Sequence, residues 1–245
     1  MSLEQTKRRV GILGGMGPEA TVLLMRRVID LTSACDDSDH VPLIVDNNTE
    51  VPSRIKAIVE KNGADPAPVL ATMARNLEAC GAKALAMPCN TAHHYASFIE
   101  GAVHIPFLNM IEMSAQRVSA MTLTKTRVGL LASPAVQSTG IFDRAFSRVQ
   151  IETLYPGDPG QMLDAIRCVK VDSADRTARQ TLDRAARELM DNGADVLLVA
   201  CSELSIIADA IPNSFPRVDT IDVLAKGIVE FSGAKLRAVD EGQVM

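Results

Sequence analysis

The sequence repeats itself, and this repeat constrains the fold more than any other feature. Residues 9–13 (RVGIL) resemble residues 127–131 (RVGLL), and residues 80–89, which end in Cys89, resemble residues 192–201, which end in Cys201. The first two segments are 118 residues apart and the second two are 112 residues apart. One match between buried strands has little weight, but two matches in the same order and at nearly the same offset indicate duplication. The chain is therefore predicted to contain two similar α/β domains.

Short apolar runs alternate with longer amphipathic stretches. The predicted buried strands are residues 10–13, 43–45, 84–87, 128–131 and 196–199. The apolar spacing predicts helices over residues 68–79, 177–190 and 221–231. Strands that are apolar throughout are typical of parallel sheets covered on both faces. We expect mostly parallel sheets of four to five strands, related by a pseudo-two-fold axis, with residues 1–105 and 212–245 in the first domain and residues 106–211 in the second.

Composition narrows the class of ligand. The net charge of −5 and the 3% of aromatic residues argue against binding to a nucleic-acid backbone. No apolar run reaches the ~18 residues of a membrane span, and a glycine-rich segment interrupts the first apolar stretch, unlike a secretory signal. The five cysteines form no CxxC pair, which argues against a disulfide framework and a zinc ribbon. We expect a cytoplasmic protein that binds a small molecule.

Cys89 and Cys201 each follow a predicted strand, where a helix is expected to begin. Ligands of open parallel sheets bind beyond the carboxyl ends of the strands, so we expect both thiols to face one cleft at the domain interface. The helix N-termini are expected to lower the pKa of both thiols. Two bases on opposite sides of a stereocentre suit a reaction in which one removes a proton and the other returns one to the opposite face. A single cysteine is more often a buried structural residue, but the polar neighbours Asn90, Thr91 and Ser202, which could equally cap helices, favour a site.

Three segments resemble the aspartate/glutamate racemase family. They are GGMGPEAT at residues 14–21, PCNTAH at residues 88–93 and ACSEL at residues 200–204. The resemblance covers nearly the whole chain in the right order, and the first segment is most similar to aspartate racemase-like members. It implies racemisation of aspartate or glutamate without pyridoxal phosphate or a metal, with Cys89 and Cys201 as the catalytic pair, and a homodimer.

The resemblance also implies a set of substrate-binding residues. They are Met16, Gly17, Arg54, Asn90, Thr91, Ser202, Glu203, Arg167 and Lys170. Arg54 matches the arginine that binds the side-chain carboxylate, a task suited to a guanidinium because it pairs with a carboxylate through two hydrogen bonds. If the resemblance is set aside, the sequence favours the interpretation of Arg54 as a solvent-exposed arginine in a loop. Arg167 stands where members of the family often have tyrosine, and the choice between Arg167 and Lys170 as a second cation stays open.

Other functions are compatible with the same residues. Within the two-cysteine fold these are racemisation of a broader range of amino acids, cis–trans isomerisation of a small diacid such as maleate, and decarboxylation, although the presence of both cysteines argues against the one-cysteine decarboxylases. A non-catalytic amino-acid-binding protein is a rival of another class. So is a nucleotide-binding protein, but the glycines at residues 11–17 do not have the G-x-G-x-x-G spacing. A metal site from Cys89, His93 and His94 lacks an evident third ligand, because adjacent histidines point to different sides of a helix.

Overall fold

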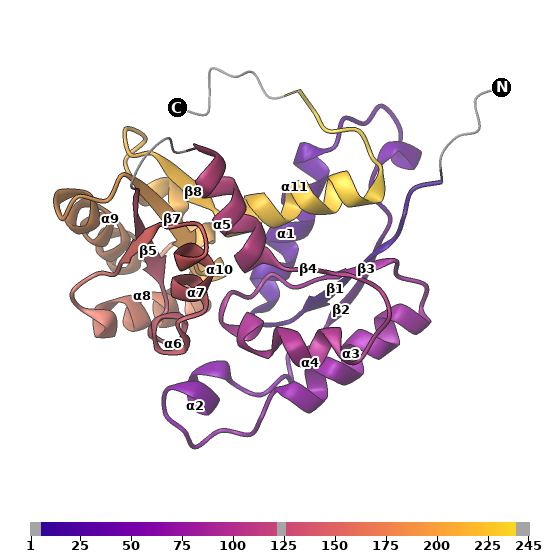
Figure 1. The fold of residues 1–245 in the computed structure, drawn as a ribbon, viewed down its shortest axis with the longest axis horizontal. Coiled ribbons are helices and arrows are strands. Elements are labelled where there is room, and N and C mark those ends of the chain that lie inside the picture. Colours follow the sequence, from indigo (N-terminus) through magenta and orange to yellow (C-terminus); the bar gives the residue numbers. More distant parts are fainter. Residues whose placement is uncertain (1–5, 122–125, 239–245) are drawn as a thin grey trace.

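The computed structural model describes residues 6–121 and 126–238, so both ends of the expected first domain (1–5 and 239–245) lie outside the described residues. Two parallel four-stranded sheets lie side by side, each with helices around it (Figure 1). The strand orders are β2-β1-β3-β4 and β6-β5-β7-β8. This confirms the predicted α/β class with parallel sheets.

The first sheet and its helices have the following bounds: β1 Val10–Gly14, α1 Pro18–Leu31, β2 Leu43–Asn47, α2 Arg54–Ile58, α3 Ala67–Ala79, β3 Ala84–Ala86, α4 Ala96–Glu100 and β4 Phe107–Leu108, with 3-10 helices η1 Asp37–Asp39 and η2 Thr91–Tyr95. The rest of the described chain forms α5 Met110–Met121, β5 Arg127–Ala132, α6 Pro134–Thr139, α7 Ile141–Ser147, β6 Glu152–Leu154, α8 Pro159–Val171, α9 Arg176–Asp191, β7 Val196–Ala200, α10 Ser202–Ile206, η3 Ala208–Ala210, β8 Arg217–Asp219 and α11 Thr220–Ser232.

The two sheets have the same strand register, as the sequence repeat predicts. Val10 of β1 pairs with Ala84 of β3, and Val128 of β5 pairs with Val196 of β7. These are the residues that the 118- and 112-residue offsets bring into correspondence. The helices before β3 and β7 also end alike, because Gly81 and Gly193 both adopt positive φ angles of 95° and 86°. Glycine is favoured at such helix ends because it has no Cβ to clash in the left-handed region.

Side chains alternate between two core layers on each sheet. Leu85, Met87 and Cys89 follow one another on the face covered by α3, while Leu197, Val199 and Cys201 do so on the face covered by α8 and α9. Each cysteine therefore continues the alternation of its strand and lies on the same face as the equivalent strand residues.

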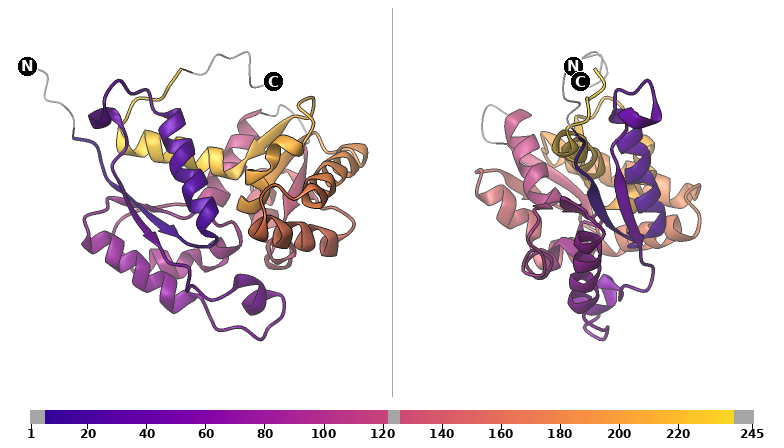
Figure 2. Two further views of the ribbon diagram at one scale, coloured as in Figure 1. Left: turned by 180° about the vertical axis from the view of Figure 1, so that it is seen from behind. Right: turned by 90° about the vertical axis from the view of Figure 1, so that its right-hand side faces the viewer.

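Two helices connect the halves of the molecule. α11 packs on α1 and β1 of the first sheet, and α5 packs against the core of the second sheet beside β5. Figure 2 shows α11 and α1 adjacent on the same side of the first sheet. The C-terminal helix therefore returns to the first half of the molecule after the second sheet is complete.

The sheets extend beyond the domain boundaries that the sequence suggested. Phe107–Leu108 pairs with β3 in the first sheet, so this sheet ends after residue 105. Arg217–Asp219 pairs with β7 in the second sheet, beyond residue 211. Within the described ranges, no helix is both long enough and apolar enough to cross a membrane.

Candidate active site

Cys89 and Cys201 occupy equivalent positions at the carboxyl ends of β3 and β7. Cys89 lies three residues beyond β3 and precedes Asn90, the N-cap residue of η2. Cys201 directly follows β7 and is the N-cap residue of α10. Their exposed fractions are 6% and 7%. Parallel strands end at one edge of the sheet, so each half brings one thiol to the edge where ligands of such sheets bind.

His93 holds the backbone of Cys89 in place. Its Nδ1 lies 2.9 Å from the carbonyl oxygen of Cys89, and the amide N–H of Met110 donates to its Nε2 at 3.2 Å. A carbonyl only accepts and an amide N–H only donates, so the ring is the neutral tautomer with its proton on Nδ1. Burial lowers the pKa of His93 to about 4. The sequence did not predict this anchoring role.

Asn90 and Thr91 reach across to the second half of the molecule. The Nδ2 group of Asn90 donates to Oγ1 of Thr220 at 3.1 Å, and Thr91 Oγ1 lies 3.1 Å from Oγ of Ser133. Asn90 is 2% exposed, and its Oδ1 has no hydrogen-bond partner among the described residues. A buried unpaired acceptor is costly. These two residues connect the Cys89 segment to loops of the other sheet, and their expected contact with substrate stays a prediction.

A short chain of polar contacts runs from Cys201 to Lys170. The Cys201 thiol donates to Oε2 of Glu203 at 3.2 Å, and the hydroxyl of Ser202 donates to the same oxygen at 3.3 Å. The other carboxylate oxygen, Oε1, pairs with Nζ of Lys170 at 3.1 Å. Glu203 is buried, whereas the Lys170 side chain is 43% exposed. The contacts therefore lead from the buried thiol to an accessible ammonium group.

The expectation that a helix N-terminus lowers both thiol pKa values is wrong for Cys201. Burial raises its pKa well above the ordinary value, and the negative charge and hydrogen bond of Glu203 raise it further. The backbone amides of Glu203 and Leu204 act in the opposite direction but are outweighed. A thiol that is removed from water and placed beside a carboxylate resists ionisation.

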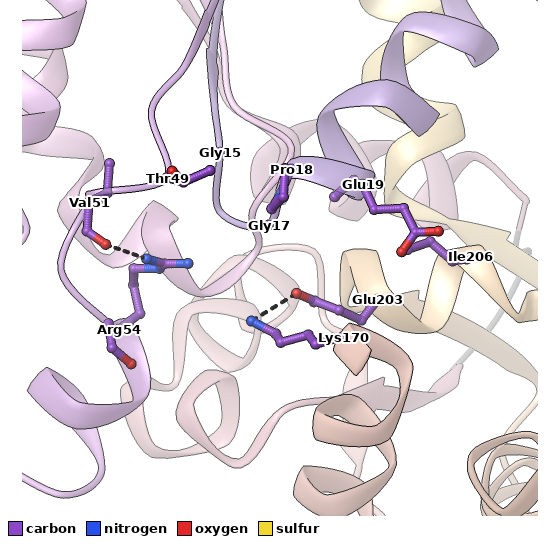
Figure 3. Close-up of a pocket in the computed structure, with 12 residues that line it drawn as sticks. Gly15, Gly17, Pro18, Glu19, Thr49, Val51, Arg54, Lys170, Glu203 and Ile206 are labelled. Atoms are coloured by element: carbon purple, nitrogen blue, oxygen red, sulfur yellow. Dashed lines mark hydrogen bonds and ion pairs between the residues drawn. The ribbon is translucent and has the colours of Figure 1, made fainter. Parts of the chain in front are cut away.

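A cavity of about 440 Å³ lies between the two halves of the molecule (Figure 3). It is lined by Gly15, Gly17, Pro18, Glu19, Ala20, Thr49, Val51, Ser53, Arg54, Lys170, Glu203 and Ile206. In Figure 3 Arg54 lies on one wall, while Lys170 and Glu203 lie across from it. Arg54 and Lys170 thus face the same space from the two halves, together with the carboxylates of Glu19 and Glu203. Lys170 is paired with Glu203, whereas Arg54 forms no ion pair among the described residues, so Arg54 is the cation best placed for an anionic ligand.

Arg54, the first residue of α2, is held by the loop that precedes this helix. Its Nη1 group donates to the carbonyl oxygens of Val51 at 3.2 Å and Pro52 at 3.0 Å, and its buried Nε has no hydrogen-bond partner within the described ranges. The backbone bonds fix the guanidinium but do not neutralise its charge. Arg54 is therefore a preorganised cation whose Nε–H group has no acceptor among the described residues.

Four of the residues that the sequence suggested line the cavity: Gly17, Arg54, Lys170 and Glu203. The cavity lining does not include Cys89, Cys201, Met16, Asn90, Thr91, Ser202 or Arg167. Met16 packs in the same core as Cys89, and Cys201 contacts the cavity residue Glu203. Arg167 is half exposed and pairs with Glu60 at 3.8 Å and Asp164 at 3.4 Å.

Sequence reasoning missed most of the neutral lining residues. Gly15 and Pro18 flank residues of the glycine-rich motif that were named, and Thr49 and Ser53 lie in the loop that carries Arg54. Their position within these two segments is the sequence feature that could have identified them as cavity residues. The sequence gave no indication that Ile206 lines the cavity, because isoleucine is typical of a buried core. Ile206 is the last residue of α10, the short helix that begins directly after Cys201.

The geometry also bears on the nucleotide-binding and metal-binding hypotheses. The amide N–H of Gly15 donates to Oγ1 of Thr21 at 2.9 Å, so this loop amide is already used and does not face a phosphate. Both ring nitrogens of His93 contact the backbone, which leaves it no free metal-binding atom. No cluster of three or more metal-binding side chains occurs among the described residues.

Comparison with known proteins places these observations in a family. The model of the Asp/Glu/hydantoin racemase family matches residues 13–228. The broad specificity amino-acid racemase RacX of Bacillus subtilis is 27% identical over 233 residues, which cover 90% of this chain and 96% of RacX.

Solved structures agree with this assignment. The Picrophilus torridus aspartate racemase is 32% identical, with a TM-score of 0.84 and coverage of 94% of this chain and 96% of its own. A glutamate racemase from Francisella tularensis shares the fold, with a TM-score of 0.64 at 15% identity and coverage of 92% of this chain and 81% of its own. The chain belongs to the Asp/Glu/hydantoin racemase family and is an amino-acid racemase.

Proposed function

We propose that the enzyme racemises aspartate or glutamate without a cofactor, using Cys89 and Cys201 as bases on opposite faces of Cα. The observation that carries this proposal is the cavity that brings Arg54 and Lys170 together from the two halves of the molecule. Two cations at one site favour a substrate with a second carboxylate. The 32% identity to an aspartate racemase supports the same substrate class.

The chemistry demands more than a base. The Cα proton of an amino acid is very weakly acidic, and without pyridoxal phosphate there is no electron sink. The negative charge that develops on the α-carboxylate must therefore be stabilised by positioned donors, which are expected to come from the segments of Asn90, Thr91 and Ser202. Each sulfur should approach Cα to about 3–3.5 Å. Because both thiols are buried in this structure, binding is expected to open a path to them.

Proton exchange at Cα tests the proposal directly. The enzyme is incubated in D₂O with a panel of L- and D-amino acids, and loss of the Cα proton signal is followed by NMR. Cys89→Ala and Cys201→Ala should each reduce racemisation by at least about 100-fold, because each removes one of two acid–base groups. Each variant should still exchange one enantiomer only. If either variant racemises at the wild-type rate, the two-base mechanism is wrong.

A broader substrate range is the second candidate. It is supported by the 27% identity to a racemase that has broad specificity. The same panel distinguishes the two, because exchange of neutral amino acids at rates equal to those of aspartate and glutamate would favour broad specificity. Turnover of a small diacid such as maleate would indicate a cis–trans isomerase, and binding without exchange would indicate an amino-acid-binding protein. We also expect a cytoplasmic homodimer, and light scattering coupled to size exclusion tests the assembly.

A further inference from the structure

We propose that Glu203 is the proton acceptor that converts the Cys201 thiol into a base, and that a substrate carboxylate triggers this transfer by drawing Lys170 away from Glu203. This inference rests on the proposed function and adds a residue role and a source of substrate selectivity. It starts from two contacts of the Glu203 carboxylate. The Cys201 thiol donates to Glu203 Oε2 at 3.2 Å, while Lys170 holds Oε1 at 3.1 Å.

The resting state of Cys201 creates the need for an acceptor. A sulfur that donates a hydrogen bond carries its proton, and burial together with the charge of Glu203 keeps that proton bound. In one direction of racemisation Cys201 must nevertheless remove the Cα proton. Its own proton has to leave first, and the carboxylate of Glu203 is in direct contact with it.

The transfer balances without any further reactant. The S–H bond of Cys201 breaks, a bond forms between the proton and Oε2 of Glu203, and the electron pair stays on sulfur. The negative charge moves from the carboxylate to the sulfur. After one turnover in this direction Cys201 carries the proton taken from Cα, Glu203 carries the former thiol proton, and Cys89 is a thiolate because it gave its proton to the other face of Cα. The starting state returns when Glu203 releases its proton to water and Cys89 takes one from water.

Lys170 controls the balance between these two states. Its ammonium group stabilises the Glu203 carboxylate and so opposes protonation of Glu203. The other charged side chains of the cavity are Arg54 from α2 and Glu19 from α1. Lys170 is 43% exposed and lines the cavity, so a substrate carboxylate beside Arg54 competes for it. Once Lys170 turns to the substrate, Glu203 becomes the better proton acceptor. A neutral amino acid leaves the Lys170–Glu203 pair intact and Cys201 protonated.

Single-cysteine backgrounds isolate the effect. In Cys89→Ala only Cys201 exchanges the Cα proton, and in Cys201→Ala only Cys89 does. We expect Glu203→Gln to slow exchange at least about 100-fold more in the Cys89→Ala background than in the Cys201→Ala background, because glutamine cannot accept the proton. Equal slowing in both backgrounds would mean that Glu203 only binds substrate, and would overturn the proposal. No slowing in the Cys89→Ala background would overturn it as well.

Lys170→Met tests the control by substrate. This variant should narrow the rate ratio between aspartate and alanine more in the Cys89→Ala background than in the Cys201→Ala background. Loss of carboxylate binding affects both backgrounds, whereas release of Glu203 from its cation affects only Cys201. Equal narrowing in both backgrounds would show that Lys170 binds substrate but does not control Cys201. Arg148 is an exposed arginine that pairs with Glu112, and Arg148→Met serves as the control for loss of a surface cation.

A measurement without substrate separates failure of this inference from failure of the proposed function. The pH dependence of Cys201 alkylation by iodoacetamide is followed by mass spectrometry of the peptide. Glu203→Gln should lower the apparent pKa of Cys201 by about one unit or more, because a nearby negative charge is removed. If no acidic amino acid is exchanged but this shift occurs, the proposed function fails and the Cys201–Glu203 coupling stands. An unchanged apparent pKa overturns the coupling.

Discussion

His93 shows how one buried side chain can fix the position of the segment that carries Cys89. Its ring accepts from the first amide of α5 and donates to the carbonyl of Cys89, and it packs beside Phe107 with ring centroids 5.2 Å apart. Protonation would place a second N–H on the ring and set it against the Met110 amide. The fold therefore requires the neutral form, which agrees with the pKa of about 4 that burial imposes.

The stability of the protein should depend on pH through His93. The pKa of the unfolded histidine is 6.5 and that of the folded one is about 4, so the unfolded state binds more protons between these values. The stabilisation from neutral His93 is complete above pH 6.5 and is lost as pH falls toward 4. We expect the wild type to lose about 2 kcal/mol from this group between pH 6.5 and pH 5.

Urea unfolding of wild type and His93→Gln across this pH range measures the effect. The variant should be less stable at pH 7 because a hydrogen-bond pair is perturbed, and the difference should shrink as pH falls. The comparison between variants is needed because the pKa of Asp219 is raised to about 7 by burial and by Asp222, which gives a pH dependence of the opposite sign. His94→Gln is the matched control, since His94 is exposed. A difference that does not change with pH would show that His93 is not held neutral.

At the scale of elements, the first strands of the two sheets share one packing requirement. An ideal Cβ on Gly11 would lie 2.9 Å from Cδ2 of Leu85, and one on Gly129 would lie 2.9 Å from Cδ2 of Leu197. Both glycines therefore allow a neighbouring leucine and a helix to approach the strand closely. The two sheets therefore share this close contact as well as the strand pattern.

Alanine at either glycine should overpack the core to a similar extent. We expect Gly11→Ala and Gly129→Ala each to lower the free energy of unfolding by about 1–3 kcal/mol, because an added methyl group displaces well-packed side chains. Denaturant titration of the two variants checks this. A large effect at one position and none at the other would mean that the two sheets do not share this packing.

The sequence predicted β1, β2, β3, β5 and β7 but not the edge strands β4, β6 and β8. β4 has two residues, and β6 and β8 have three each; β3 is equally short, but its residues are all buried, whereas most residues of the other three strands are only partly buried. β8 also contains Arg217 and Asp219, which argue against a buried strand. The predicted domain boundaries fell short for this reason, since β4 and β8 complete their sheets beyond residues 105 and 211.

The candidate site was predictable where a residue lies at the end of a strand, and unpredictable where its partner is distant in sequence. The equivalence of Cys89 and Cys201 follows from the repeat, which is a local pattern. The contact between Asn90 and Thr220 joins residues 130 positions apart, and no spacing rule reveals it. Glu203 and Cys201 are only two positions apart in the sequence, so their contact is local. Its effect on the thiol pKa depends on burial, which the sequence does not reveal.

At the scale of the whole molecule, the cavity depends on both halves at once. Arg54 reaches it from α2 of the first half, and Lys170 reaches it from α8 of the second. Pairs such as Thr91 with Ser133 and Arg167 with Glu60 also join the halves, although a half-exposed ion pair contributes little. A ligand that contacts both cations would add a further connection between the halves, and it would therefore favour the folded state.

Binding of a dicarboxylate should therefore raise the thermal stability of the protein. A ligand present at 100 times its Kd stabilises the folded state by about 2.7 kcal/mol, and for a chain of this size this corresponds to about 5–10 °C in Tm. Aspartate and glutamate should produce this shift, measured by differential scanning fluorimetry. Alanine at the same concentration should produce a smaller one, because it lacks the carboxylate that contacts Arg54 and Lys170.

Arg54→Leu and Lys170→Met should each reduce the shift, although the two residues belong to different halves of the molecule. Arg54→Leu should also raise KM for the acidic substrate more than it lowers kcat, if the guanidinium binds the ground state and the transition state alike. Arg148→Met, which removes an exposed cation paired with Glu112, controls for the change in net charge. A full shift with Arg54→Leu would contradict the carboxylate clamp and would favour a neutral substrate, because the cavity would then bind the ligand without its first cation.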